Sequence, residues 1–223
     1  MAAKPNYAEA VIFDMDGVII DSEHVWVSVM QDFFREHGSV YTEEVREKMM
    51  GSSAMFEGQF VKQVLELGDE WTPQRVSETI EQEVRRRYET KLKLIEGYRE
   101  LMDQIKQTPM RRGLASGSSD KLIKYSFDRF GLHDDFEVAL SSESVAAPKP
   151  APDVFLEAAK QLGADPSKCV GIEDSTNGVR SLKAAGMKAI ATPDHLLKDH
   201  PVFSQADVVH SALKEITLED FKL

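Results

Sequence analysis

The sequence lacks three features that would each point to a particular class of protein. It has one cysteine, Cys169, which cannot form an internal disulfide, so a disulfide-held extracellular scaffold is excluded. No apolar run approaches the roughly 18 residues that a membrane-spanning helix needs. Positive charge is scarce, since 27 Lys and Arg stand against 38 Asp and Glu, for a net charge of −11. This balance argues against nucleic acid and against an anionic membrane as partners.

The same absences suggest where the protein works. Acidic residues follow directly inside the first apolar stretch, so the N-terminus does not have the pattern of a secretory signal. We therefore expect a cytoplasmic protein, and we expect it to be a monomer. Cys169 lies in a strand-like run and is expected to be a small buried residue rather than a nucleophile. The 223 residues, 42% of them hydrophobic, suffice for one large domain or for a domain with an insert.

Short apolar runs, each followed by helix-like sequence, predict an α/β fold with a doubly wound parallel sheet. Strands buried on both faces of such a sheet are typically continuous apolar runs. The expected strands are Ala10–Phe13, Gly113–Ala115, Val170–Ile172 and Ala189–Ala191, with weaker strands at Phe136–Leu140 and Asp207–Val209.

The stretch between the first two predicted strands is far longer than one crossover helix requires. It contains helical patterns at Glu23–His37, Thr42–Met50, Phe56–Leu67 and Thr72–Leu92. The sequence therefore predicts a helical insert, residues 19–91, in an α/β core made of residues 1–18 and 92–223. Such an insert would overhang the carboxyl end of the first strand as a lid, with hinges at Val18–Asp21 and Lys91–Gly97.

Two carboxylates, Asp14 and Asp16, directly follow the first predicted strand. Ligands of parallel α/β sheets bind just beyond the carboxyl ends of the strands, which is where these acids lie. Side chains alternate along a strand, so both would point the same way, and their repulsion calls for a cation or a shared proton. A calcium loop of the EF-hand type does not fit, because Gly17 takes the fourth loop position instead of the sixth.

Three later segments carry complementary groups. Ser116 and Gly117 follow a strand and precede a helix, Lys149 lies between two prolines, and Glu173 and Asp174 end another strand. Taken singly, each has a plain structural explanation: a helix-capping loop, a solvated lysine and a second helix cap. Together they supply oxygen ligands that suit Mg²⁺, an ammonium group, and a hydroxyl with a backbone N–H. This set could hold a phosphoryl group beside an attacking carboxylate.

The four segments, in this order, resemble the signature of the haloacid dehalogenase superfamily of phosphohydrolases, in the branch with a helical cap after the first strand. The resemblance covers nearly the whole chain. It is carried by Asp14-Met-Asp16-Gly17-Val18, by Ser116 in Leu-Ala-Ser-Gly-Ser, by Lys149-Pro-Ala-Pro-Asp-Val-Phe, and by Ile172-Glu173-Asp174-Ser175-Thr-Asn-Gly178. It implies a Rossmann-like core with an inserted cap.

The resemblance also implies a role for each residue. Asp14 would be the nucleophile that forms an aspartyl-phosphate, and Asp16 would be first general acid and then general base. Ser116 and Lys149, with the Gly117 amide, would hold the phosphoryl oxygens. Mg²⁺ would be bound by Asp14, the Asp16 backbone carbonyl and Asp174, with Glu173 as a further ligand or as a partner of one.

Comparison among the branches narrows the expected reaction. True dehalogenases have no acid at the position of Asp16, so we do not expect dehalogenation. The main alternative to a phosphatase is a mutase similar to β-phosphoglucomutase. That branch has a His and an Arg in the cap where this chain has Trp26 and Ala54. The Trp and the Asp-Ser-Glu start of the insert are similar to sugar-phosphate phosphatases such as 2-deoxyglucose-6-phosphatase. We therefore favour hydrolysis of a small phosphorylated metabolite over transfer.

Two further expectations concern the insert and the reaction class. The insert residues expected to contact a small sugar or polyol phosphate are Glu23, Trp26, Ser52 and Ser53. Besides a phosphatase and a mutase, a third hypothesis is a non-catalytic switch similar to receiver domains. Such domains also gather acids, a hydroxyl and a lysine around a phosphorylated Asp, but they have no helical insert.

Overall fold

The computed structural model describes residues 6–194 and 197–223 and confirms the α/β fold. Within these residues, parallel strands form one sheet in the order β3-β2-β1-β4-β5-β6. The strands are β1 (Ala10–Phe13), β2 (Arg111–Ser116), β3 (Val138–Ser141), β4 (Cys169–Glu173), β5 (Lys188–Ala191) and β6 (Val208–Val209). The winding direction reverses between β1 and β4, and ligands of such sheets bind at this point.

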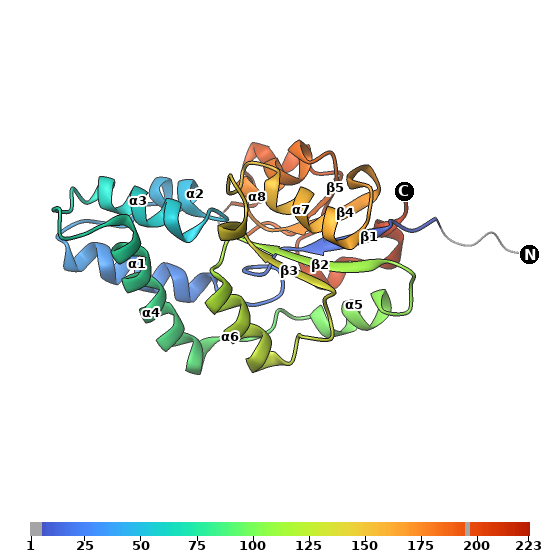
Figure 1. Cartoon of the computed structure of the whole chain (residues 1–223), viewed down its shortest axis with the longest axis horizontal. Helices are drawn as coiled ribbons and strands as arrows, with labels where there is room; N and C mark the ends of the chain where they lie inside the picture. The colour runs from blue at the N-terminus through green and yellow to red at the C-terminus, as the bar shows by residue number, and fades with distance from the viewer. Residues whose placement is uncertain (1–5, 195–196) are drawn as a thin grey trace, which may run out of the picture.

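Alternate residues of β1 pack into two apolar layers, one on each face of the sheet. Val11 and Phe13 belong to the cluster that also contains side chains of α5 (Tyr98–Ile105) and α6 (Asp120–Phe130). Ala10 and Ile12 pack with α7 (Asp153–Leu162) and α8 (Thr176–Ala184) on the opposite face. Figure 1 shows these two helix pairs on the two sides of the sheet. Short 3₁₀ helices are Ser142–Ser144, Pro166–Lys168, Pro201–Gln205, Leu213–Glu215 and Leu218–Phe221.

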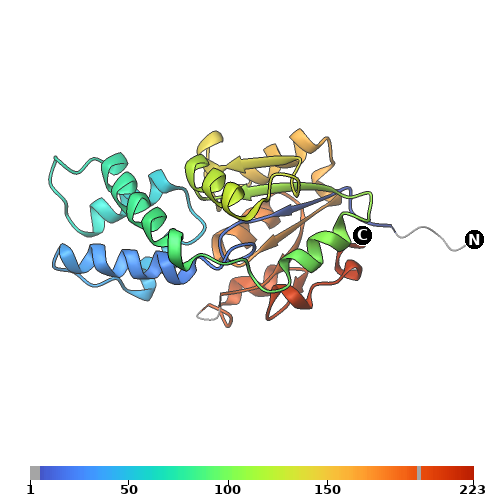
Figure 2. The same ribbon diagram turned by 90° about the horizontal axis from the view of Figure 1, so that it is seen from below.

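Four helices occupy the long stretch between β1 and β2, as predicted. They are α1 (Glu23–Glu36), α2 (Glu43–Met49), α3 (Ala54–Val64) and α4 (Pro73–Lys91). The start of α4 follows from local chemistry, because the Thr72 hydroxyl accepts the Arg75 N–H at 3.1 Å and proline occupies the first turn. These helices lie beyond the carboxyl ends of the strands (Figures 1 and 2). We call them the helical insert.

Two elements differ from the sequence-based prediction. Helix α5 was not predicted, although its buried residues Tyr98, Leu101, Met102 and Ile105 follow helical spacing. The weak strand expected at Phe136–Leu140 is shifted and spans Val138–Ser141. Phe136 precedes it and packs edge-on against Phe13, with ring centroids 5.8 Å apart. Packing in the core therefore accounts for the apolar character of Phe136.

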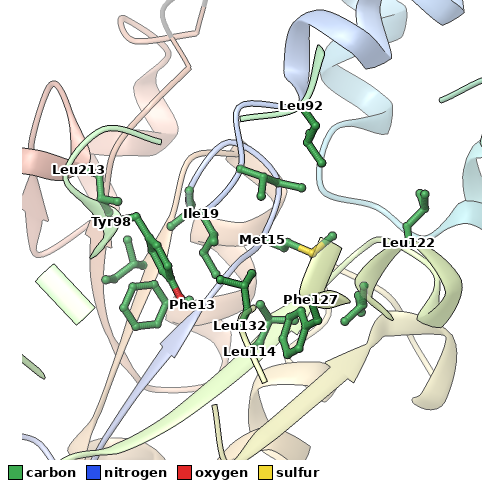
Figure 3. Close-up of a cluster of buried hydrophobic side chains, with 14 of the residues drawn as sticks. Phe13, Met15, Ile19, Leu92, Tyr98, Leu114, Leu122, Phe127, Leu132 and Leu213 are labelled. Atoms are coloured by element: carbon green, nitrogen blue, oxygen red, sulfur yellow. The ribbon is translucent and has the colours of Figure 1, made fainter. Parts of the chain in front are cut away.

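The two segments that join the helical insert to the sheet are hydrogen-bonded to each other. The N–H of Ile95 donates to the carbonyl of Ile19 and the N–H of Asp21 to that of Lys93, both at 2.9 Å. Figure 3 shows Ile19 and Leu92 in the same apolar cluster as the β1 core. The predicted hinges thus form a paired ribbon, so a movement of the insert would bend both segments together.

The helices offer no candidate for a membrane span. Within residues 6–194 and 197–223, none is both long and apolar enough to cross a bilayer.

Candidate active site

The predicted functional residues converge at the carboxyl ends of three neighbouring strands. Asp14 directly follows β1, Ser116 ends β2 and Glu173 ends β4, and these strands lie in the order β2-β1-β4. The loop after β3 brings Lys149 into the same place, although it is far away in the sequence. The sheet topology is what assembles the site.

Lys149 is the central cation. Its Nζ donates to Asp14 Oδ1 and to Glu173 Oε1, both at 2.6 Å, and to the Ala115 carbonyl at 3.0 Å. The residue is 1% exposed, so the solvated surface lysine suggested by its motif alone is wrong. Burial by itself lowers the pKa of Lys149, but the two carboxylates outweigh this effect and hold the pKa above its ordinary value. Lys149 is therefore a buried, charged ammonium group.

Three buried carboxylates meet beside this lysine. Asp14, Glu173 and Asp174 each offer an oxygen within 4.8 Å of the others. Burial raises the pKa of Asp14 to about 8, with Lys149 opposing the shift and the charges of Glu173 and Asp16 adding to it. Burial, together with the charges of Glu173 and Asp14, also raises the pKa of Asp174. A bound cation would relieve this crowding of negative charge.

The three acids are not equivalent. Both oxygens of Glu173 are engaged, Oε1 by Lys149 and Oε2 by the N–H groups of Asp174 and Ser175 at 3.1 Å and the Ser175 hydroxyl at 2.9 Å. No hydrogen bond from another described residue reaches the Asp174 carboxylate. Asp14 and Asp174 are thus the acids that can face a cation, with Glu173 behind them. Hard oxygen donors of this kind fit Mg²⁺.

Two glycines make room for these acids. A Cβ on Gly17 would lie 1.9 Å from Asp174 Oδ2, and one on Gly178 would lie 1.8 Å from the carboxyl carbon of Glu173. Neither position can therefore hold a side chain while the carboxylates keep their places. The Ser175 hydroxyl accepts the Gly178 N–H at 3.0 Å and so caps the start of α8.

Asp16 lies in a different environment from Asp14, although both line the same cleft. Its Oδ1 accepts the Ser22 hydroxyl at 2.6 Å and the Tyr88 hydroxyl at 3.2 Å, and its Oδ2 accepts the Ser118 hydroxyl at 2.6 Å. The Asp16 carboxylate is thus held by hydroxyl groups, outside the acidic cluster. Its separation from Asp14 suits two carboxylates with different tasks.

The loop after β2 forms the wall opposite the acids. The Ser118 N–H donates to the Ser116 hydroxyl at 3.0 Å, which leaves the hydrogen of that hydroxyl free to donate elsewhere. Ser119 accepts the Leu122 N–H at 3.3 Å and caps α6. Gly117 lines the cleft at this helix N-terminus, an arrangement that favours anions. Ser116 itself is fully buried just beneath.

A loop of the helical insert closes against this wall. A Cβ on Gly117 would lie 2.2 Å from the Ser52 carbonyl oxygen, and Asn177 Nδ2 donates to the Met50 carbonyl at 3.0 Å. The Ser52 hydroxyl is buried and lines the cleft, and no residue that the structure describes forms a hydrogen bond with it. An unpartnered buried hydroxyl suits a ligand oxygen. Ser53 is used differently, since its hydroxyl caps α3 by accepting the Phe56 N–H at 3.3 Å.

Glu23 and Trp26 line the cleft as predicted, but through partners that the sequence did not reveal. Trp26 Nε1 donates to the Tyr88 hydroxyl at 3.0 Å, so it connects to Asp16 through Tyr88. Glu23 accepts Arg46 Nε at 2.8 Å. Tyr88 was not identified, because a tyrosine at core spacing in α4 is indistinguishable from a packing residue.

Arg46 is the second residue that sequence reasoning missed. It is 3% exposed and also donates to Glu43 Oε1 at 2.8 Å and to Asp194 Oδ1 at 2.7 Å. Asp194 follows β5, so these contacts link the insert to the sheet. No signal marked this arginine, since it lies among charged residues typical of an exposed helix.

The resulting cleft lies between the strand ends and the insert. Its volume is about 750 Å³, including solvent at its mouth. Its walls combine carboxylates with the apolar side chains of Met30, Met49 and Leu122. A lining that combines apolar side chains with a few polar groups is typical of small-molecule sites.

Comparisons with known proteins agree with this geometry. Hexitol phosphatase B of Escherichia coli is 32% identical over 219 residues, which cover 97% of both chains. β-Phosphoglucomutase of Bacillus subtilis is 28% identical over 221 residues, covering 95% of this chain and 92% of that one. The crystal structure of β-phosphoglucomutase from Clostridium difficile has a TM-score of 0.82 at 22% identity, covering 95% of this chain and 94% of that chain, and thus shares the fold.

The family comparison covers most of the chain. The model of the haloacid dehalogenase-like hydrolases matches residues 11–192, a range that includes all four predicted motifs. The predicted superfamily, and its branch related to β-phosphoglucomutase, are thereby confirmed. With its strand-end acids, buried lysine and serine loop in place, the chain belongs to the haloacid dehalogenase-like hydrolases.

Proposed function

We propose that this protein is a Mg²⁺-dependent phosphatase that hydrolyses monophosphates of small sugars or polyols through an aspartyl-phosphate. The observation that carries the proposal is the contact between Asp14 and the buried, charged Lys149 beside the acidic cluster. The relatives named as a hexitol phosphatase and a phosphorylated carbohydrates phosphatase support the reaction and the class of substrate.

The arrangement of side chains supports a two-step reaction. Lys149 holds Oδ1 of Asp14, which leaves the other oxygen to attack phosphorus as the bond to the leaving alcohol breaks. Asp16 would donate its proton to the leaving oxygen. In the second step Asp16 would take a proton from water, which attacks phosphorus, releases phosphate and restores Asp14.

Other groups would hold the phosphoryl oxygens during both steps. We assign this role to the Ser116 hydroxyl, the Gly117 N–H and Lys149, because Gly117 lines the cleft, Ser116 directly precedes it and Lys149 contacts Asp14. The carboxylates of Asp14 and Asp174 and the Asp16 backbone carbonyl would bind Mg²⁺, with Glu173 as their neighbour. When bound, Mg²⁺ supplies positive charge that offsets the charge of the phosphoryl group.

Hydrolysis is favoured over mutase activity by the insert. Trp26, which stands where the mutase branch has a His, donates its ring N–H to Tyr88 and presents an apolar ring to the cleft. Ala54, which stands where that branch has an Arg, lines the cleft without a charge. Neither residue can bind a second phosphate or take part in proton transfer.

We expect wild-type protein to release phosphate from sugar and polyol monophosphates with Mg²⁺ and to lose this activity with EDTA. The physical reason is the repulsion among Asp14, Asp174 and an incoming dianion, which only a cation offsets. A colorimetric phosphate assay over a panel of monophosphates measures this. Adding excess Mg²⁺ after EDTA is the control for irreversible damage. Equal release with and without EDTA would contradict the metal requirement, and faster isomerisation of glucose 1-phosphate than phosphate release would favour the mutase.

We also propose that residues 19–91 act as a cap on the core formed by residues 1–18 and 92–223. The support is the close approach of Ser52 to Gly117, together with the paired ribbon that joins the two parts. Closure of this kind would exclude water from the phosphoryl site.

Gly117→Ala tests the cap. Its Cβ would meet the Ser52 carbonyl at 2.2 Å, so the cap loop must withdraw, and we expect kcat/KM to fall by about 10²-fold. The melting temperature should change little, because the clash is with the loop and not with the sheet. Gly131→Ala, at the other end of α6, is the control: it strains a residue with φ of 64° but has nothing within 4 Å. Unchanged kcat/KM in Gly117→Ala would refute the need for closure.

A further inference from the structure

We propose that the insert side of the cleft selects phosphate esters whose leaving alcohol carries no second negative charge, with Glu57 as the residue that sets this preference. The inference rests on the proposed phosphatase function and concerns the part of the cleft beyond the phosphoryl group. It assigns to this protein monophosphates of neutral polyhydroxy compounds, and it excludes bisphosphates and phosphorylated sugar acids.

The insert contributes several carboxylates to the lining of the cleft. Glu57 of α3 and Glu81 of α4 join Glu23 of α1 in the lining. No hydrogen bond or ion pair from another described residue reaches the side-chain carboxyl group of Glu57 or of Glu81. Burial raises the pKa of Glu57 to about 8, and the nearby charges of Asp16, Glu23 and Glu81 add to this shift. The same surroundings would repel an anionic group on a substrate.

Arg46, the cation that could offset the charge of these acids, is already engaged in ion pairs. Arg46 is the one cationic side chain in the lining, within the part of the chain that the structure describes. Its Nε, Nη1 and Nη2 donate to Glu23, Glu43 and Asp194 at 2.7–2.8 Å. A second phosphate or a carboxylate could bind Arg46 only by breaking buried ion pairs, which is costly.

The other groups in this part of the cleft suit a neutral polyol. Carboxyl oxygens accept hydrogen bonds from hydroxyl groups, and the rings of Trp26 and Tyr41 offer apolar surface to the carbon chain. A hydroxyl of the substrate would give the Glu57 carboxyl group the hydrogen-bond partner that the described residues do not supply. Neutral hydroxyl-bearing compounds are therefore bound, and anionic ones are rejected by charge.

The test compares two substrates that differ in one group. Sorbitol 6-phosphate and 6-phosphogluconate have the same length and the same phosphate, but the second carries a carboxylate at the distal end. We expect wild-type kcat/KM at pH 9, above the raised pKa of Glu57, to be about 10²-fold higher for sorbitol 6-phosphate. At this pH Glu57→Gln should lower the ratio by about tenfold, because it removes one like charge and keeps the side-chain shape.

Glu78→Gln is the matched control, since Glu78 is an exposed residue of α4 outside the cleft lining and the change in net charge is the same. It should leave the ratio unchanged. A wild-type ratio near one, or a ratio that Glu57→Gln does not move, would overturn the inference. A third outcome would also overturn it: rapid hydrolysis of 6-phosphogluconate that Arg180→Gln selectively slows. Arg180 and Lys48 line a separate cavity beside Ser52, so this result would mean that the carboxylate of the substrate binds there.

Hydrolysis of p-nitrophenyl phosphate separates this inference from the function on which it rests. If the wild type hydrolyses this ester but does not discriminate between the two sugar derivatives, the phosphatase function stands and charge selection is wrong. If it hydrolyses no ester in the presence of Mg²⁺, the proposed function fails, and the selection built on it fails as well.

Discussion

Asp14→Asn is expected to abolish phosphate release, with a loss of at least about 10⁴-fold in kcat, while the protein stays folded. An amide cannot form the phosphoryl bond, but it has nearly the same volume as the carboxyl group. Asp14 is 5% exposed, and burial disfavours its ionised form, so a neutral amide suits the surroundings. Lys149 also keeps its contact with Glu173 at 2.6 Å.

The measurement pairs phosphate release with thermal unfolding. The melting temperature of Asp14→Asn should remain within a few degrees of wild type, and Asp103→Asn, an exposed change of the same kind on α5, should affect neither quantity. Substantial turnover by Asp14→Asn would remove Asp14 as the nucleophile. A large drop in melting temperature would instead point to a structural role for the carboxylate.

Asp16→Asn should have the next largest effect, and the effect should depend on the leaving group. We expect release from a sugar phosphate to fall by about 10²–10⁴-fold, since its alkoxide needs a proton as it leaves. The first step with p-nitrophenyl phosphate should be far less affected, because nitrophenolate leaves without a proton. The second step still lacks a base for water, so a phosphoryl adduct should accumulate on the protein.

Intact-protein mass spectrometry after mixing with p-nitrophenyl phosphate detects the adduct. The double variant Asp14→Asn/Asp16→Asn is the control and should show none, because the acceptor oxygen is absent. Equal losses with both esters and no adduct would show that Asp16 does not transfer protons. In that case the hydrogen bonds of Asp16 to Ser22, Ser118 and Tyr88 would have only a structural role.

The prediction of the core succeeded for a physical reason that can be read in β1. The run Ala10–Phe13 is apolar throughout because the strand is buried on both faces, and the acids begin where that burial ends. The same change from apolar to polar residues marks the ends of β2 and β4. Since the carboxyl ends of parallel strands lie at one edge, their polar residues were expected to meet, and Asp14, Lys149 and Glu173 do so.

The insert was predictable as helices but not as a binding surface. The periodicity of the sequence indicates which face of each helix is apolar, but it does not indicate which residues of the insert face the ends of the strands. Ser53 illustrates this, since it was predicted to contact the substrate and its hydroxyl caps α3 in the structure. Glu57 was not identified, because one acid in a helix gives no sign that it lines a cleft.

The sequence by itself thus determined the α/β class, the site of the insert and the residues at the strand ends, because burial and strand polarity act locally along the chain. Tertiary structure alone decided what surrounds Asp16 and how Arg46 is used. Tyr88 reaches Asp16 from 72 residues away and Asp194 reaches Arg46 from 148 residues away. Contacts at such separations depend on how the insert packs against the sheet, and no local pattern of residues encodes that packing.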